Sequence, residues 1–320
     1  MPRIVYSRRY NIGFFGLERL HPFDSRKYGR AWRVLRERFG RRLDEMWIRP
    51  ERPASREELL LVHSEEYLHQ LRHSKYVARA LEVPSVAVLP AWTVDRCVLR
   101  PMRFAVRGTI MAARASLDHG LAVNLSGGYH HAKPESGEGF SIYSDIGIAI
   151  AALRRDGLLS DDARVAYIDL DAHQGNGVCR VFERDSRVFI FDMYNALIYP
   201  LEIATRQRID CDIPLFSACG DEEYLGKLQS RLPGFLDSAG RTRPIGLAIF
   251  NAGTDILLDD PLGCMNVSAA AILERDLYVV KQLRHRDIPT VMVLSGGYTR
   301  QSYQLVANSV SRLLESPREN

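Results

Sequence analysis

The stretch Arg164-Val-Ala-Tyr-Ile-Asp-Leu-Asp-Ala-His-Gln-Gly-Asn176 passes from a nearly continuous apolar run into a cluster of polar residues. Such an apolar run predicts a strand buried on both faces, as the strands of a parallel sheet are. Similar runs recur along the chain, so we expect strands over Arg3–Ser7, Leu121–Leu125, Arg164–Leu170, Arg187–Asp192, Ile245–Asn251 and Pro289–Leu294.

Helical patterns lie between these runs, over Met102–Asp118, Asp145–Asp156, Asp221–Ala239, Ser268–Arg284 and Thr299–Leu314. The alternation of strands and helices predicts an α/β protein with a central, mostly parallel sheet flanked by helices. Because no low-complexity linker divides the chain, we expect residues 1–320 to form a single domain. The stretch Tyr10–Ile48, rich in Gly and Arg, is expected to form a loop and a helix at one edge of the sheet.

The composition excludes several classes of protein. With 46% hydrophobic and 26% charged residues, the chain can bury a large core, so the bulk of it is not disordered. No apolar run approaches the roughly 20 residues of a membrane span, and the N-terminus lacks a signal-peptide pattern. We therefore expect a cytoplasmic protein.

Five cysteines without a Cys-x-x-Cys pair indicate neither a disulfide framework nor a zinc finger. The net charge of +4 comes from scattered arginines, so no nucleic-acid partner is expected.

Polar clusters follow four of the predicted strands. They are Ser126-Gly-Gly-Tyr-His-His, Asp169-Leu-Asp-Ala-His-Gln-Gly-Asn, Asn251-Ala-Gly-Thr-Asp and Ser295-Gly-Gly-Tyr. Open α/β sheets bind their ligands at the carboxyl ends of the strands. The four clusters therefore predict one ligand site at that edge of the sheet.

Three of these residues have the chemistry of metal ligands. In an extended segment, Asp171 and His173 project to the same side, and Asp255 comes from another strand end. Two carboxylates and one imidazole suit zinc, with iron, cobalt or manganese as alternatives, and three protein ligands leave a position for water and substrate. The alternative is that these aspartates only cap the helices that follow them.

The remaining polar residues suit acid–base work and oxyanion stabilisation. Histidine is the side chain best suited to transfer protons near neutral pH, and Asp169 and Asn176 are available to orient His130 and His131. The hydroxyl of Tyr298 can donate a hydrogen bond to a developing oxyanion. The alternatives are exposed histidines and a tyrosine that only packs on its glycine-rich turn.

Taken together, the clusters resemble the histone deacetylase superfamily, zinc-dependent amidohydrolases with the arginase–deacetylase fold. The similarity is greatest to class IV deacetylases and suggests a bacterial member. It covers residues 5–315 and rests on motifs in chain order: Arg9-Tyr-Asn-Ile, Leu20-His-Pro-Phe-Asp, Leu99-Arg-Pro, Gly127-Gly-Tyr-His-His-Ala, Gly139-Phe, Asp169-Leu-Asp-Ala-His-Gln-Gly-Asn-Gly, Asn251-Ala-Gly-Thr-Asp-Ile-Leu and Ser295-Gly-Gly-Tyr.

The resemblance implies a role for each site residue. Asp171, His173 and Asp255 would bind one Zn²⁺ ion. His131 would act first as general base and then as general acid, while His130, oriented by Asp169, would give electrostatic support. Tyr298 would stabilise the oxyanion together with zinc. A narrow acyl-lysine tunnel would be lined by Gly139, Phe140, Tyr199 and Leu262.

The chain departs from the class I pattern at two positions. Asn176 rather than Asp pairs with His131, which should leave this histidine less basic, and Gln174 stands where many relatives carry a second histidine. The resemblance also implies a structural K⁺ ion beneath the zinc site, held by Asp169, Asp171, His173, Asp192 and Met193. A second monovalent site would involve Phe182, Asp185 and Val188.

The leading hypothesis is hydrolysis of an Nε-acyl-lysine amide in a protein or peptide, with an acetyl group or a longer acyl chain. Hydrolysis of acetylpolyamines is the alternative, although the segments Arg8–Asp24 and Ile198–Arg208 carry more bases than acids. An arginase-like pair of metals would need more aspartates near Asp255. A binding module without activity is the last alternative, and the complete set of ligands argues against it. The oligomeric state stays open.

Overall fold

The central element of the computed structural model is one parallel β-sheet. The structure describes residues 1–13, 24 and 26–315, and within these residues eight strands pair side by side in the order β2-β1-β3-β8-β7-β4-β5-β6, with every pair parallel. Their bounds are β1 Arg3–Val5, β2 Trp47–Ile48, β3 Leu121–Asn124, β4 Arg164–Asp169, β5 Val188–Asn195, β6 Cys211–Leu215, β7 Ile245–Asn251 and β8 Thr290–Val293.

The six strands expected from the sequence are confirmed, with ends that shift by a few residues. The two edge strands were not predicted. β2 has only two residues, and β6 contains Pro214, which removes a backbone donor and is tolerated in a sheet at an edge. The fold class is therefore the predicted one, and the sheet is parallel in all its pairings.

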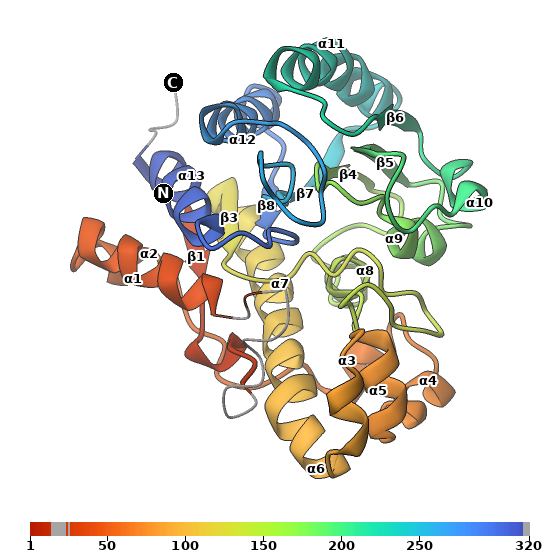
Figure 1. Cartoon of the computed structure of the whole chain (residues 1–320). Helices are drawn as coiled ribbons and strands as arrows, with labels where there is room; N and C mark the ends of the chain where they lie inside the picture. The colour runs from red at the N-terminus through yellow and green to blue at the C-terminus, as the bar shows by residue number, and fades with distance from the viewer. Residues whose placement is uncertain (14–23, 25, 316–320) are drawn as a thin grey trace.

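Helices cover both faces of the sheet (Figure 1). One face carries α1 Lys27–Phe39, α11 Asp221–Gly240, α12 Ala269–Arg284 and α13 Ser302–Glu315. The other face carries the long helix α7 and its neighbour α8. The elements on this side, with the short connecting helices, are α3 Arg56–Leu59, α4 Glu65–Gln70, α5 Ser74–Ala80, η3 Pro84–Val88, α6 Ala91–Val94, the π-helical η4 Asp95–Leu99, α7 Arg100–His119, α8 Asp145–Arg155 and α9 Asn176–Val181. The remaining helices are η1 Arg8–Tyr10, α2 Arg42–Met46 and α10 Ile203–Arg206. The expected helix at the edge of the sheet is α1.

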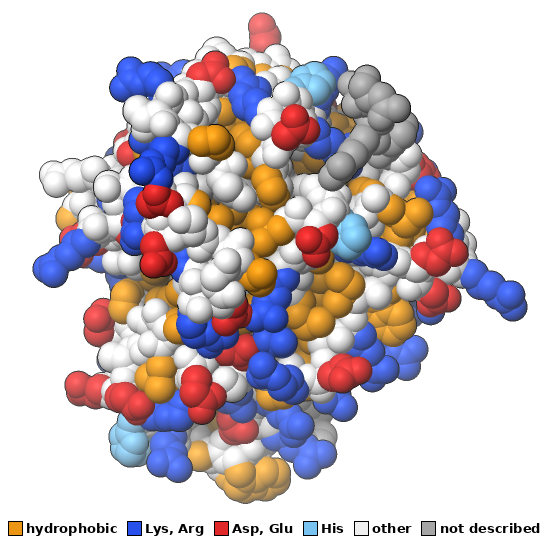
Figure 2. All heavy atoms as spheres, turned by 180° about the vertical axis from the view of Figure 1, so that it is seen from behind, with side chains coloured by type: hydrophobic (Ala, Val, Ile, Leu, Met, Phe, Trp, Pro, Cys, Tyr) orange, Lys and Arg blue, Asp and Glu red, His pale blue; other side chains and the backbone are white. Residues whose placement is uncertain are grey.

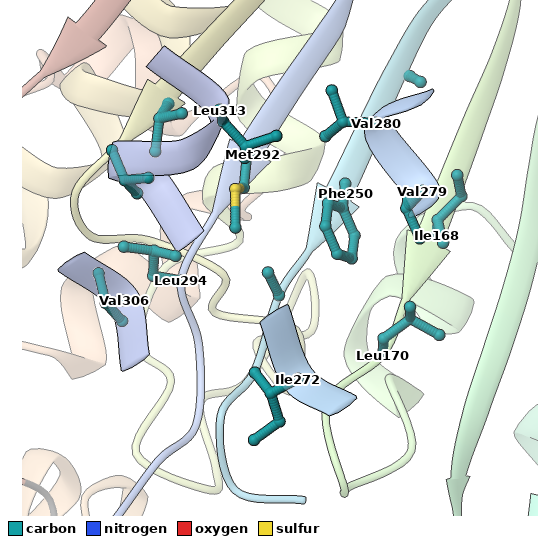
Figure 3. Packing of buried hydrophobic residues seen from close by; sticks show 14 of the residues in the cluster. Ile168, Leu170, Phe250, Ile272, Val279, Val280, Met292, Leu294, Val306 and Leu313 are labelled. Carbon is teal, nitrogen blue, oxygen red and sulfur yellow. The ribbon is translucent and has the colours of Figure 1, made fainter. Parts of the chain in front are cut away.

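The apolar strands fill two cores because successive side chains point to opposite faces. Ile168, Phe250 and Met292 lie in the core beneath α12 and α13 (Figure 3). Their chain neighbours Tyr167 and Ile249 lie in the other core, beneath α7 and α8. This two-sided burial explains why the runs are almost continuously apolar rather than alternating.

The surface shows no concentration of one charge on the face opposite to that of Figure 1. Lys and Arg side chains are interspersed there with Asp and Glu (Figure 2). Among the helices of the described part of the chain, none is both long and apolar enough to span a membrane.

Candidate active site

The predicted metal ligands meet at the carboxyl edge of the sheet. Asp171 and His173 follow β4, and Asp255 follows the neighbouring strand β7. The Nδ1 atom of His173 lies 3.0 Å from Asp171 Oδ1 and 2.9 Å from Asp255 Oδ2. All three side chains are buried, and one ligand atom from each falls within 4.8 Å of the others. The structure therefore brings together the three residues that the sequence singled out.

The charge of this cluster shows that it fits a cation. Burial alone lowers the pKa of His173, but its hydrogen bonds with Asp171 and Asp255 outweigh burial and raise the pKa to about 10. Burial, followed by the nearby charge of Asp171, raises the pKa of Asp255 to about 7. Two buried carboxylates thus draw a positive charge to one point. A divalent ion bound there would supply that charge, so the residues fit a single metal ion.

Backbone groups hold the outer oxygens of the two carboxylates. Asp171 Oδ2 accepts hydrogen bonds from the hydroxyl of Ser295 and, at 2.7 Å, from the backbone N–H of Gly296. Asp255 Oδ1 accepts a bond of 3.0 Å from the backbone N–H of Ala172. Bonds of this kind orient metal ligands before any ion arrives.

The first histidine of the pair, His130, has a carboxylate as its hydrogen-bond partner. His130 Nδ1 lies 2.8 Å from Asp169 Oδ2. Burial lowers the pKa of His130, but the charges of Asp169 and Asp171 more than offset this and raise it to about 8. Asp169 also accepts hydrogen bonds from Tyr167 and Asn251, at 2.6 and 2.9 Å. Asp169 is therefore a fixed acceptor that orients His130.

The second histidine has a neutral partner. His131 Nδ1 lies 2.8 Å from Asn176 Oδ1, as the sequence predicted. Burial, with the neighbouring rings of His130 and His173, holds the pKa of His131 well below its usual value. The imidazole of His131 is thus uncharged at neutral pH and available to accept a proton.

Tyr298 and Phe140 stand together at a pocket that opens beside the histidines. Their ring centroids lie 6.0 Å apart, and the ring of Tyr298 lies 6.2 Å from that of His173. Burial keeps the pKa of Tyr298 well above its usual value, so its hydroxyl keeps the proton that it would donate. His130, His131 and Gly139 also line this pocket.

The predicted tunnel residues fall into two groups. An added Cβ on Gly139, which has φ of +52°, would lie 2.5 Å from the ring of His131, so only glycine fits there. Tyr199 is partly exposed, and its ring centroid lies 5.2 Å from that of His131. Neither Tyr199 nor Leu262 is among the described residues that line the pocket, and the backbone N–H of Leu262 instead bonds to Asp260. The motif beginning at Leu20 lies outside the described residues as far as Phe23.

Sequence reasoning missed one whole wall of the pocket. This wall is mostly apolar and comes from the segment between α5 and the start of α7, with Leu81, Val83, Ser85, Val86, Leu89, Val98 and Met102 as its lining residues. It also missed Lys27, a buried lysine at the start of α1. Its ammonium group donates hydrogen bonds of 2.7 and 2.8 Å to the backbone carbonyls of Ser295 and Gly296. Neither feature has a motif, because apolar residues and single lysines occur throughout the chain.

The two expected monovalent sites differ. Asp192 is fully buried next to Asp169, and its Oδ1 atom has no hydrogen-bond partner among the described residues. The charge of Asp169 adds to burial in raising the pKa of Asp192 well above its usual value, and a cation there would relieve both effects. Met193 lies buried in the core beside it.

At the second expected site, the backbone carbonyls accept hydrogen bonds from Arg208 instead. Its guanidinium bonds to Phe182 at 2.7 Å, to Asp185 at 2.9 Å and to Val188. The guanidinium of Arg208 thus contacts the carbonyl groups that we expected to bind an ion. These contacts do not support a second ion at this place, and the second monovalent site stays a prediction.

Comparison with known proteins identifies a family. Residues 21–314 match the family model of the histone deacetylase domain. The chain is 44% identical to histone deacetylase 2 of Arabidopsis thaliana over 97% of its own length and 78% of the plant protein.

Two solved structures share the fold. One is the crystal structure of the HDA15 HD domain, with a TM-score of 0.74, 19% identity and 98% of this chain and 91% of that chain covered. The other is an HDAC homologue complexed with SAHA, with a TM-score of 0.72, 23% identity and 97% and 84% covered. The sheet with its flanking helices is thus the arginase–deacetylase fold.

From the family match and the plant relative, the chain belongs to the histone deacetylase domain family and is an enzyme of the hydrolase class.

Proposed function

We propose that the chain is a zinc-dependent lysine deacylase, which hydrolyses the amide of an Nε-acyl-lysine in a protein or peptide. The products are a carboxylate and the free lysine amine. One observation carries this proposal: in the buried Asp171–His173–Asp255 cluster, the ring centroid of His173 lies 6.0 Å from that of His131 and 6.2 Å from that of Tyr298, and the latter two residues line one largely apolar pocket. Metal-dependent amide hydrolysis needs a cation, a base and an oxyanion donor within reach of the same carbonyl group, and these residues would hold the cation and supply the base and the donor.

Asp171, His173 and Asp255 would hold one Zn²⁺ ion. When bound, the ion supplies a Lewis acid that polarises the amide carbonyl and makes water more acidic. The outer oxygen of Asp171 stays engaged with Ser295 and Gly296, so this ligand is already oriented. We further propose a K⁺ ion near Asp192, supported by the unpartnered Oδ1 atom of this buried carboxylate.

The protein's own groups move the protons. His131 accepts a proton at Nε2 from the water that attacks the carbonyl carbon, because its Nδ1 is engaged with Asn176. It then gives this proton to the lysine nitrogen as the C–N bond breaks. His130, held by Asp169, keeps a positive charge near the reacting atoms. The hydroxyl of Tyr298 donates a hydrogen bond to the oxygen that gains negative charge.

The pocket suits an apolar acyl group. Its wall between α5 and α7 is made mostly of Leu, Val and Met side chains, which would bury a hydrocarbon chain at about 0.8 kcal/mol per methylene group. The same wall offers no carboxylate to the ammonium groups of an acetylpolyamine. We therefore favour acyl-lysine, including acyl groups longer than acetyl. The residues Gln174 and Asn176 support a place within class IV.

Acyl-lysine peptides of increasing chain length, assayed in parallel with an acetylpolyamine, test this proposal. Val83→Trp would fill part of the pocket from its apolar wall. Val88→Trp is the matched control, because Val88 ends the short helix η3 that Val83 precedes but is 85% exposed. We expect Val83→Trp to lower kcat/KM for long acyl chains at least tenfold and to leave acetyl-lysine within about threefold. Turnover of the acetylpolyamine alone would contradict the proposal.

A further inference from the structure

The side-chain amide of Asn176 is hydrogen-bonded on both sides. Its oxygen faces His131 Nδ1 at 2.8 Å. Its nitrogen donates two bonds, one of 2.6 Å to Glu138 Oε1 and one of 2.8 Å to Glu202 Oε2. Asn176 is fully buried, so these partners decide which way the amide faces. Neither glutamate has a role in the chemistry described so far.

Two cations hold this pair of carboxylates in place. The ammonium group of Lys133 lies 3.0 Å from Glu138 and 3.0 Å from Glu202. Arg180 donates a bond of 3.0 Å to the other oxygen of Glu202. Lys133 and Arg180 thus place two positive charges beside the two carboxylates. In agreement, the hydrogen bonds to Glu202 outweigh its burial and keep its pKa below the usual value.

An ionised carboxylate only accepts hydrogen bonds, and this fixes the direction of the whole chain of contacts. The nitrogen of Asn176 must face the glutamates, because the reversed amide would set its oxygen against two negative charges. The oxygen of Asn176 must then face His131. Since this oxygen also only accepts, Nδ1 of His131 must be the protonated nitrogen, and Nε2 carries the free lone pair.

We infer that Glu138 and Glu202 are positioning residues that set the tautomer of His131 through Asn176. This inference rests on the proposed function, because it gives His131 Nε2 to the reaction as the proton acceptor. The glutamates come from two different loops, one before Phe140 and one before α10. Through Asn176 they therefore also connect these two loops to His131.

The same contacts explain why Asn rather than Asp stands at position 176. An aspartate has no N–H group to offer, so it would set a third carboxylate against Glu138 and Glu202. The amide is the side chain of this size that can accept from a histidine and donate to a carboxylate at once. The residue at position 176 and the glutamate pair therefore form one unit.

The test replaces the glutamates while Lys133 and Arg180 stay. In the double variant Glu138→Ala, Glu202→Ala, the two cations attract the amide oxygen and favour the reversed orientation of Asn176. Its N–H group then faces His131 Nδ1 and moves the ring proton to Nε2. The double variant Glu138→Gln, Glu202→Gln keeps an acceptor at each position and should retain the native orientation. Glu183→Ala is the matched control, because Glu183 pairs with Arg180 but is largely exposed and does not bond to Asn176.

Two measurements read the outcome in the metal-loaded protein. The ¹⁵N spectrum of its imidazoles, with His131 assigned by substitution, reports which nitrogen carries the proton. Steady-state kinetics on an acyl-lysine peptide separates kcat from KM. For the double Ala variant we expect a shift toward the Nε2–H form and a loss in kcat of at least tenfold, up to the 10²–10⁴ that a general base contributes, with KM within about threefold. The double Gln variant and Glu183→Ala should keep the wild-type tautomer and kcat.

A folded double Ala variant with the Nδ1–H tautomer and wild-type kcat would overturn the inference. If that variant does not fold, Glu202→Ala alone, which keeps Glu138, should show a smaller change in the same direction. An unchanged tautomer and kcat in Glu202→Ala would then overturn it. The spectrum needs no substrate. A wild-type protein that hydrolyses no acyl-lysine peptide would refute the proposed function, and the tautomer would still test the inference.

Discussion

Gly296 lies against the proposed metal ligand Asp255 so closely that an added Cβ would stand 2.1 Å from Asp255 Oδ2. The same Cβ would lie 2.6 Å from Asp171 Oδ2. The turn that carries Tyr298 is thus packed directly on two of the three ligands. The proposed oxyanion donor and the proposed metal ligands form one structural unit, although they are far apart in the chain.

Gly296→Ala should therefore disrupt the metal cluster. The new methyl group must push the carboxylates of Asp171 and Asp255 apart, because real Cβ atoms do not approach other atoms this closely. We expect the metal content, measured by elemental analysis, to fall at least tenfold. Gly226→Ala in α11 is the control, since its Cβ would meet no atom within 4 Å. That variant should keep its metal and gain about 0.5–1 kcal/mol of stability. Full metal content in Gly296→Ala would show that the turn can move away.

Tyr298→Phe removes only the hydroxyl that we assign to the oxyanion. The interaction exists mainly in the transition state, so its loss should lower kcat by about 10²–10³ and leave KM nearly unchanged. Metal content and the unfolding temperature should stay near wild type, because the ring is kept. Tyr278→Phe, whose hydroxyl bonds to a backbone carbonyl far from the site, is the control. Wild-type turnover in Tyr298→Phe would mean that Tyr298 only packs on its turn.

The sequence predicted the parts of the site that follow from strand ends. Asp171, His173 and Asp255 could be grouped because the carboxyl ends of parallel strands meet at one edge, and the runs before them were long and apolar. Glu138 and Glu202 could not be found in this way. They act through Asn176 across loops whose paths depend on tertiary packing. The apolar wall around Val83 was missed for a related reason, since an apolar side chain that lines a pocket looks like one that fills a core.

His63 should make stability depend on pH. It is buried, its Nδ1 bonds to Pro134 O at 3.2 Å, and its Nε2 accepts a bond of 2.9 Å from the backbone N–H of Ser144. Burial lowers its pKa to about 4. Between pH 6.5 and 4 the unfolded chain binds a proton here that the folded chain does not, so stability falls as the pH falls.

The size of this effect follows from the shift in pKa. A shift from 6.5 to about 4 corresponds to about 3 kcal/mol in the free energy of unfolding, lost as the pH drops through this range. Urea unfolding at a series of pH values measures it. His63→Gln, which keeps an acceptor for Ser144, should reduce the slope by close to one proton. His69→Gln, at an exposed histidine, is the control. Equal slopes in wild type and His63→Gln would refute the assignment.

At the second expected monovalent site, the guanidinium of Arg208 should stabilise the fold in place of an ion. Arg208→Met leaves the carbonyls of Phe182, Asp185 and Val188 without their donor, and hydrogen bonds from a charged group contribute about 1.5–3 kcal/mol each. We expect a lower unfolding temperature, partly restored by K⁺. Arg206→Met, which removes an arginine stacked on Tyr194, is the control and should show no such restoration beyond that of wild type. An equal response to K⁺ in Arg208→Met and wild type would contradict the assignment.

The account depends most directly on metal-dependent cleavage of the acyl-lysine amide, and one measurement tests this. The protein is stripped of metal, reloaded with Zn²⁺ and incubated with an acyl-lysine peptide in H₂¹⁸O, and the products are followed by mass spectrometry. We predict free lysine and one ¹⁸O atom in the released carboxylate, at one Zn²⁺ ion per chain. Turnover should vanish in the stripped protein, return on reloading and be absent from Asp255→Ala. Equal turnover in the stripped protein, or in a folded Asp255→Ala variant, would contradict the account.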